Sequence, residues 1–212
     1  WNLSDYSNQE FRHHTHPIKS IAWSPRGNYL AMGSDDMTLS VWDINRRRVL
    51  FQTVAGFAGG HRDSVEAVAW SPDEGRLVSG GGGTGYLDKS VRLWDATTGH
   101  FLQLMSGHKR PVLSVAWSPN GKLIASGDGN TEYNDSGAIC IWDADTGRLI
   151  TEVHGYTAPV KKVAWRPNKH PDKQYLLTGS ENNSIYLWKV YRQQGCWKIC
   201  LNWKSTSNAG LM

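Results

Sequence analysis

Short apolar runs separated by polar turns recur along the whole chain. The segments IKSIAWSPRGNYLAMG, VEAVAWSPDEGRLVSG and VLSVAWSPNGKLIASG begin at Ile18, Val65 and Val112, and a looser copy, VKKVAWRPNKHPDKQYLLTG, begins at Val160. Each run is rich in Val, Ile, Leu and Trp and is bounded by turn residues, which is typical of β-strands. No window of a dozen residues keeps an apolar period of 3.6 residues. We therefore expect an all-β protein with almost no helix.

The spacing of the tryptophans defines a repeat. Trp23, Trp70, Trp117 and Trp165 are separated by 47, 47 and 48 residues, and a second tryptophan follows each of them. A single four-stranded sheet cannot cover its own apolar faces, so repeats of this length suit sheets that stack radially on their neighbours. The sequence therefore predicts a β-propeller, or part of one, in a single region over residues 1–212.

Recurring Trp-Asp and Gly-His pairs indicate the kind of repeat. Trp-Asp begins at Trp42, Trp94 and Trp142, and Gly-His ends at His61 and His108. With these pairs in phase with the repeats, the chain resembles the WD-repeat β-propeller family. The resemblance implies four blades, each of four antiparallel strands. Their cores are expected at about residues 14–43, 61–95, 108–143 and 156–189.

The resemblance also implies that a hydrogen-bonded set of His, Ser or Thr, Asp and Trp holds each blade together. The second repeat has every member, as His61, Ser79, Asp88 and Trp94. Because buried polar groups need partners, this complete set should make the second blade the best held. The other expected members are His14, Asp36 and Trp42 in the first repeat, His108, Ser126 and Trp142 in the third, and Thr178 and Trp188 in the fourth.

The first, third and fourth repeats depart from this set. In the first, Met32 stands where Ser is expected. In the third, Ser136 takes the Asp position, with Asp135 one residue before it. The departures of the fourth repeat are Tyr156 for His, Asn182 for Asp and Lys189 after its tryptophan. We expect the fourth blade to depend more on packing.

The two ends of the chain bear on whether the ring closes. Residues 1–12 resemble the outer strand of a preceding blade, and the chain starts at Trp1 rather than Met, so we expect sequence upstream. Residues 196–212 hold a last outer strand and a tail, KSTSNAGLM, that fits no blade element. With one surplus outer strand, we expect an arc of a larger ring of about seven blades, and a closed four-blade ring is the alternative. An arc exposes two apolar faces, so self-association is expected.

Composition narrows the classes of partner. The chain has 23 Lys and Arg against 19 Asp and Glu, and the excess is spread along it. This falls short of the basic stripe of a dedicated nucleic-acid binder, so nucleic acid is the less favoured partner. The 3 cysteines form no disulfide framework or metal knuckle, which suits a reducing cytoplasm. No apolar run is long enough to span a membrane, so we expect no membrane partner.

Two motifs invite a catalytic or phosphate-binding interpretation. His61, Ser79 and Asp88 are the side chains of a hydrolase triad, but the family resemblance makes them internal fasteners, without an exposed nucleophile or oxyanion hole. The glycines within residues 80–85 spell GxGxxG, which binds phosphate only between a strand and a helix. No helix is expected there, so we expect a loop and no catalytic residue.

A histidine cluster near the start of the chain could hold a metal. His13, His14 and His16 offer imidazole ligands, which suit zinc or copper. Their one near carboxylate is Glu10, and His14 already belongs to the expected blade set. We therefore expect no metal and no cofactor.

The favoured function is a non-enzymatic scaffold or sensor propeller that binds protein partners, alone or within a larger signalling or regulatory protein. The alternatives are a small-ligand or enzymatic propeller that uses the central channel, and a nucleic-acid-binding platform. The loops between strands b and c are longer in the second and third repeats, and recognition residues accumulate in loops. Loop drift without function explains their length equally well. The candidate partner-binding residues in and beside these loops are Arg62, Tyr86, Lys109, Arg110, Glu132 and Tyr133.

Overall fold

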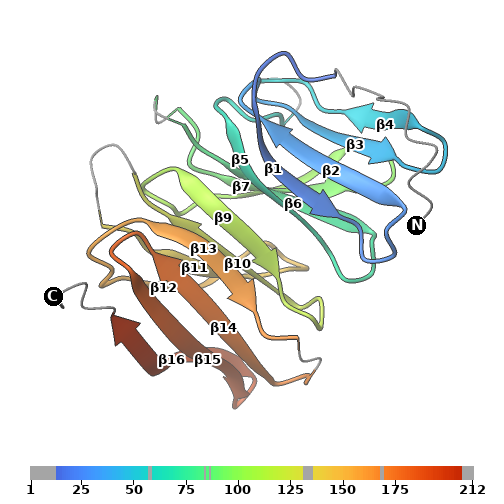
Figure 1. The fold of residues 1–212 in the computed structure, drawn as a ribbon. Coiled ribbons are helices and arrows are strands. Elements are labelled where there is room, and N and C mark those ends of the chain that lie inside the picture. Colours follow the sequence, from blue (N-terminus) through green and yellow to red (C-terminus); the bar gives the residue numbers. More distant parts are fainter. Residues whose placement is uncertain are drawn as a thin grey trace, which may run out of the picture.

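The fold consists of four similar antiparallel sheets. A computed structural model describes residues 13–56, 59–83, 85, 87–130, 136–167 and 170–206. Within these residues every assigned element is a β-strand. Each sheet consists of four strands that are consecutive in the chain (Figure 1). The prediction of an all-β chain with four blades of four antiparallel strands is confirmed.

Each blade runs from an inner strand a to an outer strand d. The strands of blade 1 are β1 (Ile18–Trp23), β2 (Tyr29–Ser34), β3 (Leu39–Asp43) and β4 (Arg48–Gln52). The strands of blade 2 are β5 (Val65–Trp70), β6 (Arg76–Gly81), β7 (Val91–Asp95) and β8 (Phe101–Met105). The strands of blade 3 are β9 (Val112–Trp117), β10 (Leu123–Asp128), β11 (Ile139–Asp143) and β12 (Leu149–Val153). The strands of blade 4 are β13 (Val160–Trp165), β14 (Lys173–Ser180), β15 (Ser184–Gln193) and β16 (Cys196–Thr206).

The turn between strands a and b forms much as its Ser-Pro-x-Gly pattern predicts. In blade 1 the Ser24 hydroxyl accepts the Tyr29 backbone N–H at 3.2 Å, and Gly27 takes a left-handed φ of 76°. Blade 2 differs, because Glu74, one residue before Gly75, is the left-handed residue, with a φ of 65°. The left-handed position is the third residue after the serine in both turns, and in blade 2 a glutamate stands there because the glycine comes one residue later.

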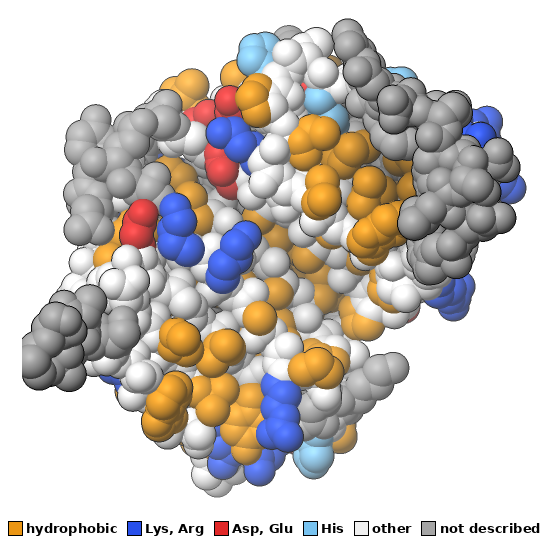
Figure 2. Space-filling model, viewed as in Figure 1, with side chains coloured by type: hydrophobic (Ala, Val, Ile, Leu, Met, Phe, Trp, Pro, Cys, Tyr) orange, Lys and Arg blue, Asp and Glu red, His pale blue; other side chains and the backbone are white. Residues whose placement is uncertain are grey.

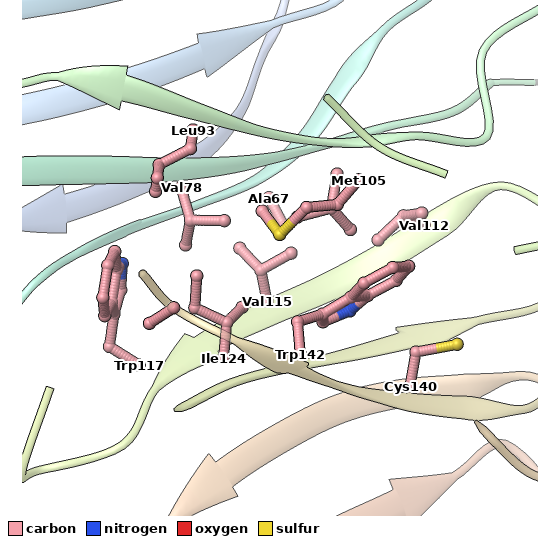
Figure 3. Close-up of a cluster of buried hydrophobic side chains, with 12 residues drawn as sticks. Ala67, Val78, Leu93, Met105, Val112, Val115, Trp117, Ile124, Cys140 and Trp142 are labelled. Atoms are coloured by element: carbon pink, nitrogen blue, oxygen red, sulfur yellow. The ribbon is translucent and has the colours of Figure 1, made fainter. Parts of the chain in front are cut away.

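Apolar side chains of adjacent blades interlock to form the core. Strand β1 packs against β5, β5 against β9, and β9 against β13. Between blades 2 and 3, buried residues such as Val78, Met105, Val115 and Ile124 meet in one cluster (Figure 3). Every blade therefore completes its neighbour, as expected for sheets that cannot cover their own faces.

The four blades form an open arc. Blades 1 and 4 lie at its opposite ends (Figure 1). Trp70, Trp117 and Trp165 are at most 8% exposed because each packs on the preceding blade, whereas Trp23, at the same position of blade 1, is 54% exposed. Apolar side chains gather on the surface at both ends of the arc (Figure 2). The closed four-blade alternative is therefore wrong, and the total number of blades in a full ring stays a prediction.

The last blade is longer than the others. Its strands β14, β15 and β16 have 8, 10 and 11 residues, against 5 or 6 in blades 1–3. A two-residue turn with positive φ at both Gln194 and Gly195 joins β15 to β16, which is a favoured hairpin geometry. Strand β16 continues to Thr206, so the expectation that the tail from Lys204 fits no blade element is wrong for its first three residues. Residues 1–12 and 207–212 lie outside the described residues.

Candidate interaction site

The polar set of blade 2 forms one buried network. The Nδ1–H of His61 donates to the Asp88 carboxylate at 2.9 Å, and Nε2 accepts from the Ser79 hydroxyl at 2.7 Å. The indole N–H of Trp94 donates to the same hydroxyl oxygen at 2.7 Å. Arg92 extends the network, because its guanidinium donates to Asp88 at 3.0 Å. The network therefore joins strands b and c to the loop that precedes strand a.

Burial and hydrogen bonding set the ionisation of this network. Burial lowers the pKa of His61, and the Asp88 hydrogen bond opposes it only in part, so the imidazole is neutral. Burial alone would raise the pKa of Asp88, but hydrogen bonds from His61, Ser90 and the Arg62 backbone hold it well below its usual range. The buried Asp88 carboxylate thus neutralises the buried Arg92 guanidinium directly, and the neutral imidazole of His61 donates to the same carboxylate.

The triad-like arrangement of His61, Ser79 and Asp88 has no access for a substrate. His61 and Ser79 are both fully buried. The Ser79 hydroxyl already bonds both His61 and Trp94, so it is not poised as a free nucleophile. A hydrolase would need the serine at an open cleft with oxyanion donors beside it. The arrangement can therefore fasten the blade, and it offers no surface for acyl transfer.

Blade 1 obtains its hydroxyl from a different strand. The Nδ1 of His14 bonds Asp36 at 3.0 Å, and its Nε2 bonds the Ser40 hydroxyl at 2.7 Å. Ser40 lies on β3, directly opposite Met32 on β2. The inference that Met32 leaves blade 1 without its serine is therefore corrected, because the cross-strand neighbour places a hydroxyl at the same point. Trp42 packs at the ring of His13.

Blade 3 obtains its carboxylate from a different position. The Nδ1 of His108 bonds Asp128 at 2.9 Å, and its Nε2 bonds the Ser126 hydroxyl, which also accepts the Trp142 indole N–H at 2.7 Å. The assignment of Ser136 to the Asp position is wrong, since Ser136 is exposed. The residue proposed beside it, Asp135, lies outside the described residues.

The register explains why Asp128 can serve. It ends β10 at the position that Gly81 holds in β6, next to the histidine ring. A Cβ at Gly81 would overlap the His61 ring and come within 2.7 Å of the Asp88 Cγ atom. In blade 2 the last position of strand b is therefore Gly81, and the carboxylate comes from Asp88 in the next loop. In blade 3 the same position is Asp128, which supplies the carboxylate itself. The hydrogen-bonded histidine is complete in blades 1, 2 and 3.

Blade 4 replaces the histidine by a tyrosine. The Tyr156 hydroxyl and the Thr178 hydroxyl lie 2.7 Å apart, and the Trp188 indole N–H donates to both, at 3.0 and 3.1 Å. Burial raises the pKa of Tyr156 to about 12, so the phenol stays neutral. Asn182 is outside this set, because its side chain bonds the exposed Thr157.

The remaining candidate chemistry is not assembled. The glycines of the GxGxxG motif run from β6 into a loop that leads to β7, and the described residues of this loop include no helix N-terminus that could hold a phosphate. Among the described residues no group of three or more His, Cys, Asp and Glu side chains could hold a metal. In that same part of the chain, no helix is long and apolar enough to span a membrane.

A polar hollow lies where the inner strands of all four blades begin. It encloses about 280 Å³ and is lined by Lys19 and Asp35 of blade 1, Asp63 and Glu66 of blade 2, Pro111 and Leu113 of blade 3, and Lys161 of blade 4. Lys19 pairs with Asp35 at 3.8 Å, and Lys161 pairs with Glu181 at 3.9 Å. Within the described residues no ion pair involves Asp63 or Glu66. The blade 2 side of the hollow therefore carries two carboxylates without a cationic partner, of which Asp63 accepts the backbone N–H groups of Ser64 and Leu87.

Three of the predicted partner-binding residues are described, and none of these three lines this hollow. Arg62 is exposed and lines a second hollow of about 540 Å³ beside blade 2, together with Leu87 and Leu104. Lys109 is exposed, and Arg110 is half-buried next to Pro111. The other three predicted residues, Tyr86, Glu132 and Tyr133, lie outside the described residues.

The charged residues of the first hollow were missed by the sequence interpretation, although a signal was present. The second residue of strand a is Lys19, Glu66, Leu113 or Lys161 in the four repeats. Three of these four equivalent positions are charged, although they lie within apolar strands, next to the loops that precede strand a. Aligning the repeats at this position would have found the hollow.

Comparisons with known proteins agree with the repeat pattern. The WD40 family model, described as "WD domain, G-beta repeat", matches residues 6–43, 52–95, 99–143 and 147–189. The chain is 37% identical over 95 residues, 45% of its length, to THO complex subunit 3 of Arabidopsis thaliana. It is 35% identical over 86 residues, 41% of its length, to anaphase-promoting complex subunit cdc20 of Dictyostelium discoideum. These matches cover 29% and 16% of the relatives' own lengths.

A solved structure shows the same fold. The protein described as U3-55K superposes with a TM-score of 0.69 over 89% of this chain and 53% of its own, at 17% identity. At that identity the likeness concerns the fold alone. Four phased repeats, four four-stranded blades and a family model that matches most of the sequence lead to one conclusion. The chain belongs to the WD40 family of WD-domain, G-beta repeats.

Proposed function

We propose that this chain is a non-enzymatic platform that binds a protein partner at the loop face around the polar hollow. The observation that carries the proposal is that all four blades contribute side chains to this one hollow. Its volume of about 280 Å³ is below the range of about 300–1,000 Å³ typical of small-molecule sites. A hollow of this size suits one or two side chains of a protein segment better than a cofactor.

The charges of the hollow indicate what such a segment carries. Asp63 and Glu66 lack ion pairs in the described structure, while Lys19 and Lys161 are already paired. A Lys or Arg of the partner would meet Asp63 and Glu66. The exposed Arg62 directly precedes Asp63 in the chain, and the exposed Lys109 lies two residues before Pro111, which lines the hollow. The relatives named above are subunits of multi-protein complexes, which supports binding to protein. Tyr86, Glu132 and Tyr133 stay in the proposal on the sequence argument.

Affinity capture from a native extract, followed by mass spectrometry, tests the site. Reversing both carboxylates, Asp63→Lys with Glu66→Lys, should remove the specific partner from the captured proteins, because like charges then face its cation. The matched control is Asp145→Lys with Asp172→Lys, which makes the same charge change at exposed turns at the opposite end of the strands.

Comparing the two variants distinguishes an effect of the hollow from an effect of the protein's net charge. Loss in the Asp63/Glu66 variant and retention in the control support the proposal. Retention of every partner in a folded Asp63/Glu66 variant would refute it. A second double variant, Tyr86→Ala with Tyr133→Ala, asks whether the long loops of repeats two and three take part.

A further inference from the structure

The long strands of blade 4 carry a set of cations around two tyrosines. Cross-strand pairing places Lys173 opposite Tyr191, Tyr175 opposite Lys189, and Tyr191 opposite Lys198. The backbone N–H of Arg166 donates to the Tyr175 carbonyl, which brings Arg166 to the same end of the sheet. These residues therefore share one face of β14, β15 and β16. We call this set the basic extension: Arg166, Lys173, Tyr175, Lys189, Tyr191 and Lys198.

Two of these cations stand where blades 1–3 have residues that close turns. Asp143, which follows the second tryptophan of blade 3, accepts the Thr146 backbone N–H and closes the turn to strand d. Ser118 accepts the Leu123 backbone N–H and closes the turn to strand b. In blade 4 these positions are Lys189 and Arg166. Strand β15 continues past Lys189, and a longer connection leads from Arg166 to β14, so neither short turn is present and both positions are basic.

The basic extension has no acidic partner in the described structure. Of the ion pairs found there, none includes any of its four cations. Instead, the Arg166 guanidinium lies 5.7 Å and the Lys173 ammonium 5.6 Å from the centre of the Tyr175 ring. The Lys189 ammonium lies 4.9 Å from the centre of the Tyr191 ring. Like charges are thus held together on a flat sheet face, with only aromatic rings to offset their repulsion.

The outer part of the extension also lies beyond the reach of an ordinary neighbouring blade. Lys173, Tyr191 and Lys198 lie past the points where the strands of blades 1–3 end. A sheet with strands of 5 or 6 residues, packed on blade 4, would cover Leu177 and Ile185 and leave Lys173, Tyr191 and Lys198 open. It would also reach Tyr175, because Tyr29 and Arg76, at the equivalent positions, contact Trp70 and Trp117 of the next blade. Figure 2 shows orange and blue side chains side by side at this end of the arc.

We infer that the basic extension binds an acidic polypeptide segment, whose carboxylates meet Arg166, Lys173, Lys189 and Lys198. This surface is separate from the polar hollow and does not depend on the function proposed there. Charge complementarity is the reason for an acidic ligand. A polypeptide is favoured over single-stranded nucleic acid, because cations already occupy the ring faces of Tyr175 and Tyr191 on which bases would stack.

Fluorescence anisotropy with labelled poly-glutamate as the probe tests the inference. The whole chain should bind poly-glutamate at low salt, and affinity should fall as salt is added. Lys173→Glu with Lys189→Glu should weaken binding about tenfold, because two attractions become repulsions. The control, Arg48→Glu with Arg148→Glu, makes the same charge change beside the outer strands of blades 1 and 3, and its affinity should change by less than about twofold.

A second readout places the ligand on this face. Cys200 is exposed and lies opposite Lys189 across the hairpin. A fluorophore on Cys200, in a Cys196→Ser background, should respond to poly-glutamate. Lys173→Gln with Lys189→Gln, which only removes charge, should give an intermediate loss if the Glu variant folds poorly.

Three results would overturn the inference. The first is no binding of poly-glutamate by the folded chain at low salt. The second is equal weakening in the Lys173/Lys189 variant and its control. The third is tighter binding of oligo-dT than of poly-glutamate, lost in the same variant, which would assign the surface to nucleic acid.

Discussion

At the scale of single residues, Asp88 is the buried carboxylate that links the blade 2 network. Its carboxylate accepts from His61, from the Ser90 hydroxyl and from Arg92. We predict that Asp88→Ala lowers the free energy of unfolding by about 3–5 kcal/mol, because it leaves a buried guanidinium without its counter-charge. Urea denaturation followed by tryptophan fluorescence measures the loss.

Asn182→Ala is the matched change in blade 4. Asn182 bonds only exposed or backbone groups, so the variant should lose less than about 1 kcal/mol. Equal losses in the Asp88 and Asn182 variants would show that the blade 2 network adds no particular stability.

The lowered pKa of Asp88 gives a pH dependence with a definite sign. The folded carboxylate has a pKa below the ordinary value of about 3.9, so its stabilisation is complete above that pH and is lost as pH falls below it. The difference in unfolding free energy between the wild type and Asp88→Asn should therefore be constant from about pH 7 to 5 and shrink below about pH 4. Urea titrations at several pH values check this, and a difference that grows in acid would contradict it.

The sequence predicted the whole His, Ser, Asp and Trp set of blade 2, but in blades 1 and 3 it missed one member of each set. His61, Ser79 and Asp88 follow the common order and come together as that order implies. Ser40 and Asp128 were missed because a hydrogen bond depends on where an atom lies in space. A residue on the neighbouring strand, such as Ser40, or at the end of a strand, such as Asp128, can reach the same histidine ring. The spacing of residues within one repeat does not reveal this, because it does not specify the pairing register.

At the scale of the element, the tryptophan of strand a joins one blade to the next. The Trp70 indole N–H donates to the Ala22 carbonyl of blade 1 at 2.9 Å, and Trp70 is 7% exposed. We predict that Trp70→Ala costs about 3–5 kcal/mol of unfolding free energy through the lost packing. Trp23→Ala should cost less than about 1 kcal/mol, since that ring is 54% exposed.

Thermal and urea unfolding of the two tryptophan variants, at low protein concentration, distinguish these cases. A large loss in Trp23→Ala would mean that another surface covers blade 1 in solution.

The strands themselves were predictable from short apolar runs between turn residues. The length of blade 4 was not, because the extra pairing of β15 with β16 depends on the Gln194-Gly195 turn rather than on apolar pattern.

At the scale of the whole molecule, both ends of the arc expose apolar surface. Ile21 and Trp23 of blade 1 are 63% and 54% exposed, and Leu177 and Trp203 of blade 4 are 43% and 53% exposed. We predict that the isolated 212-residue chain self-associates with rising concentration. Static light scattering over a concentration series measures its mass. Trp23→Lys with Trp203→Lys should reduce the association, and a wild-type chain that stays monomeric throughout would contradict the prediction.

The choice between Gly81 with Asp88 in blade 2 and Asp128 in blade 3 has a consequence for how such repeats evolve. Adding a side chain at Gly81 first would push it into His61 and Asp88. Removing Asp88 first would leave the buried Arg92 guanidinium without its counter-charge. Each route from one arrangement to the other thus begins with a damaging step, although both end points are stable. The repeats of a single chain can therefore keep different solutions to the same problem, because selection acting on one substitution at a time cannot exchange them.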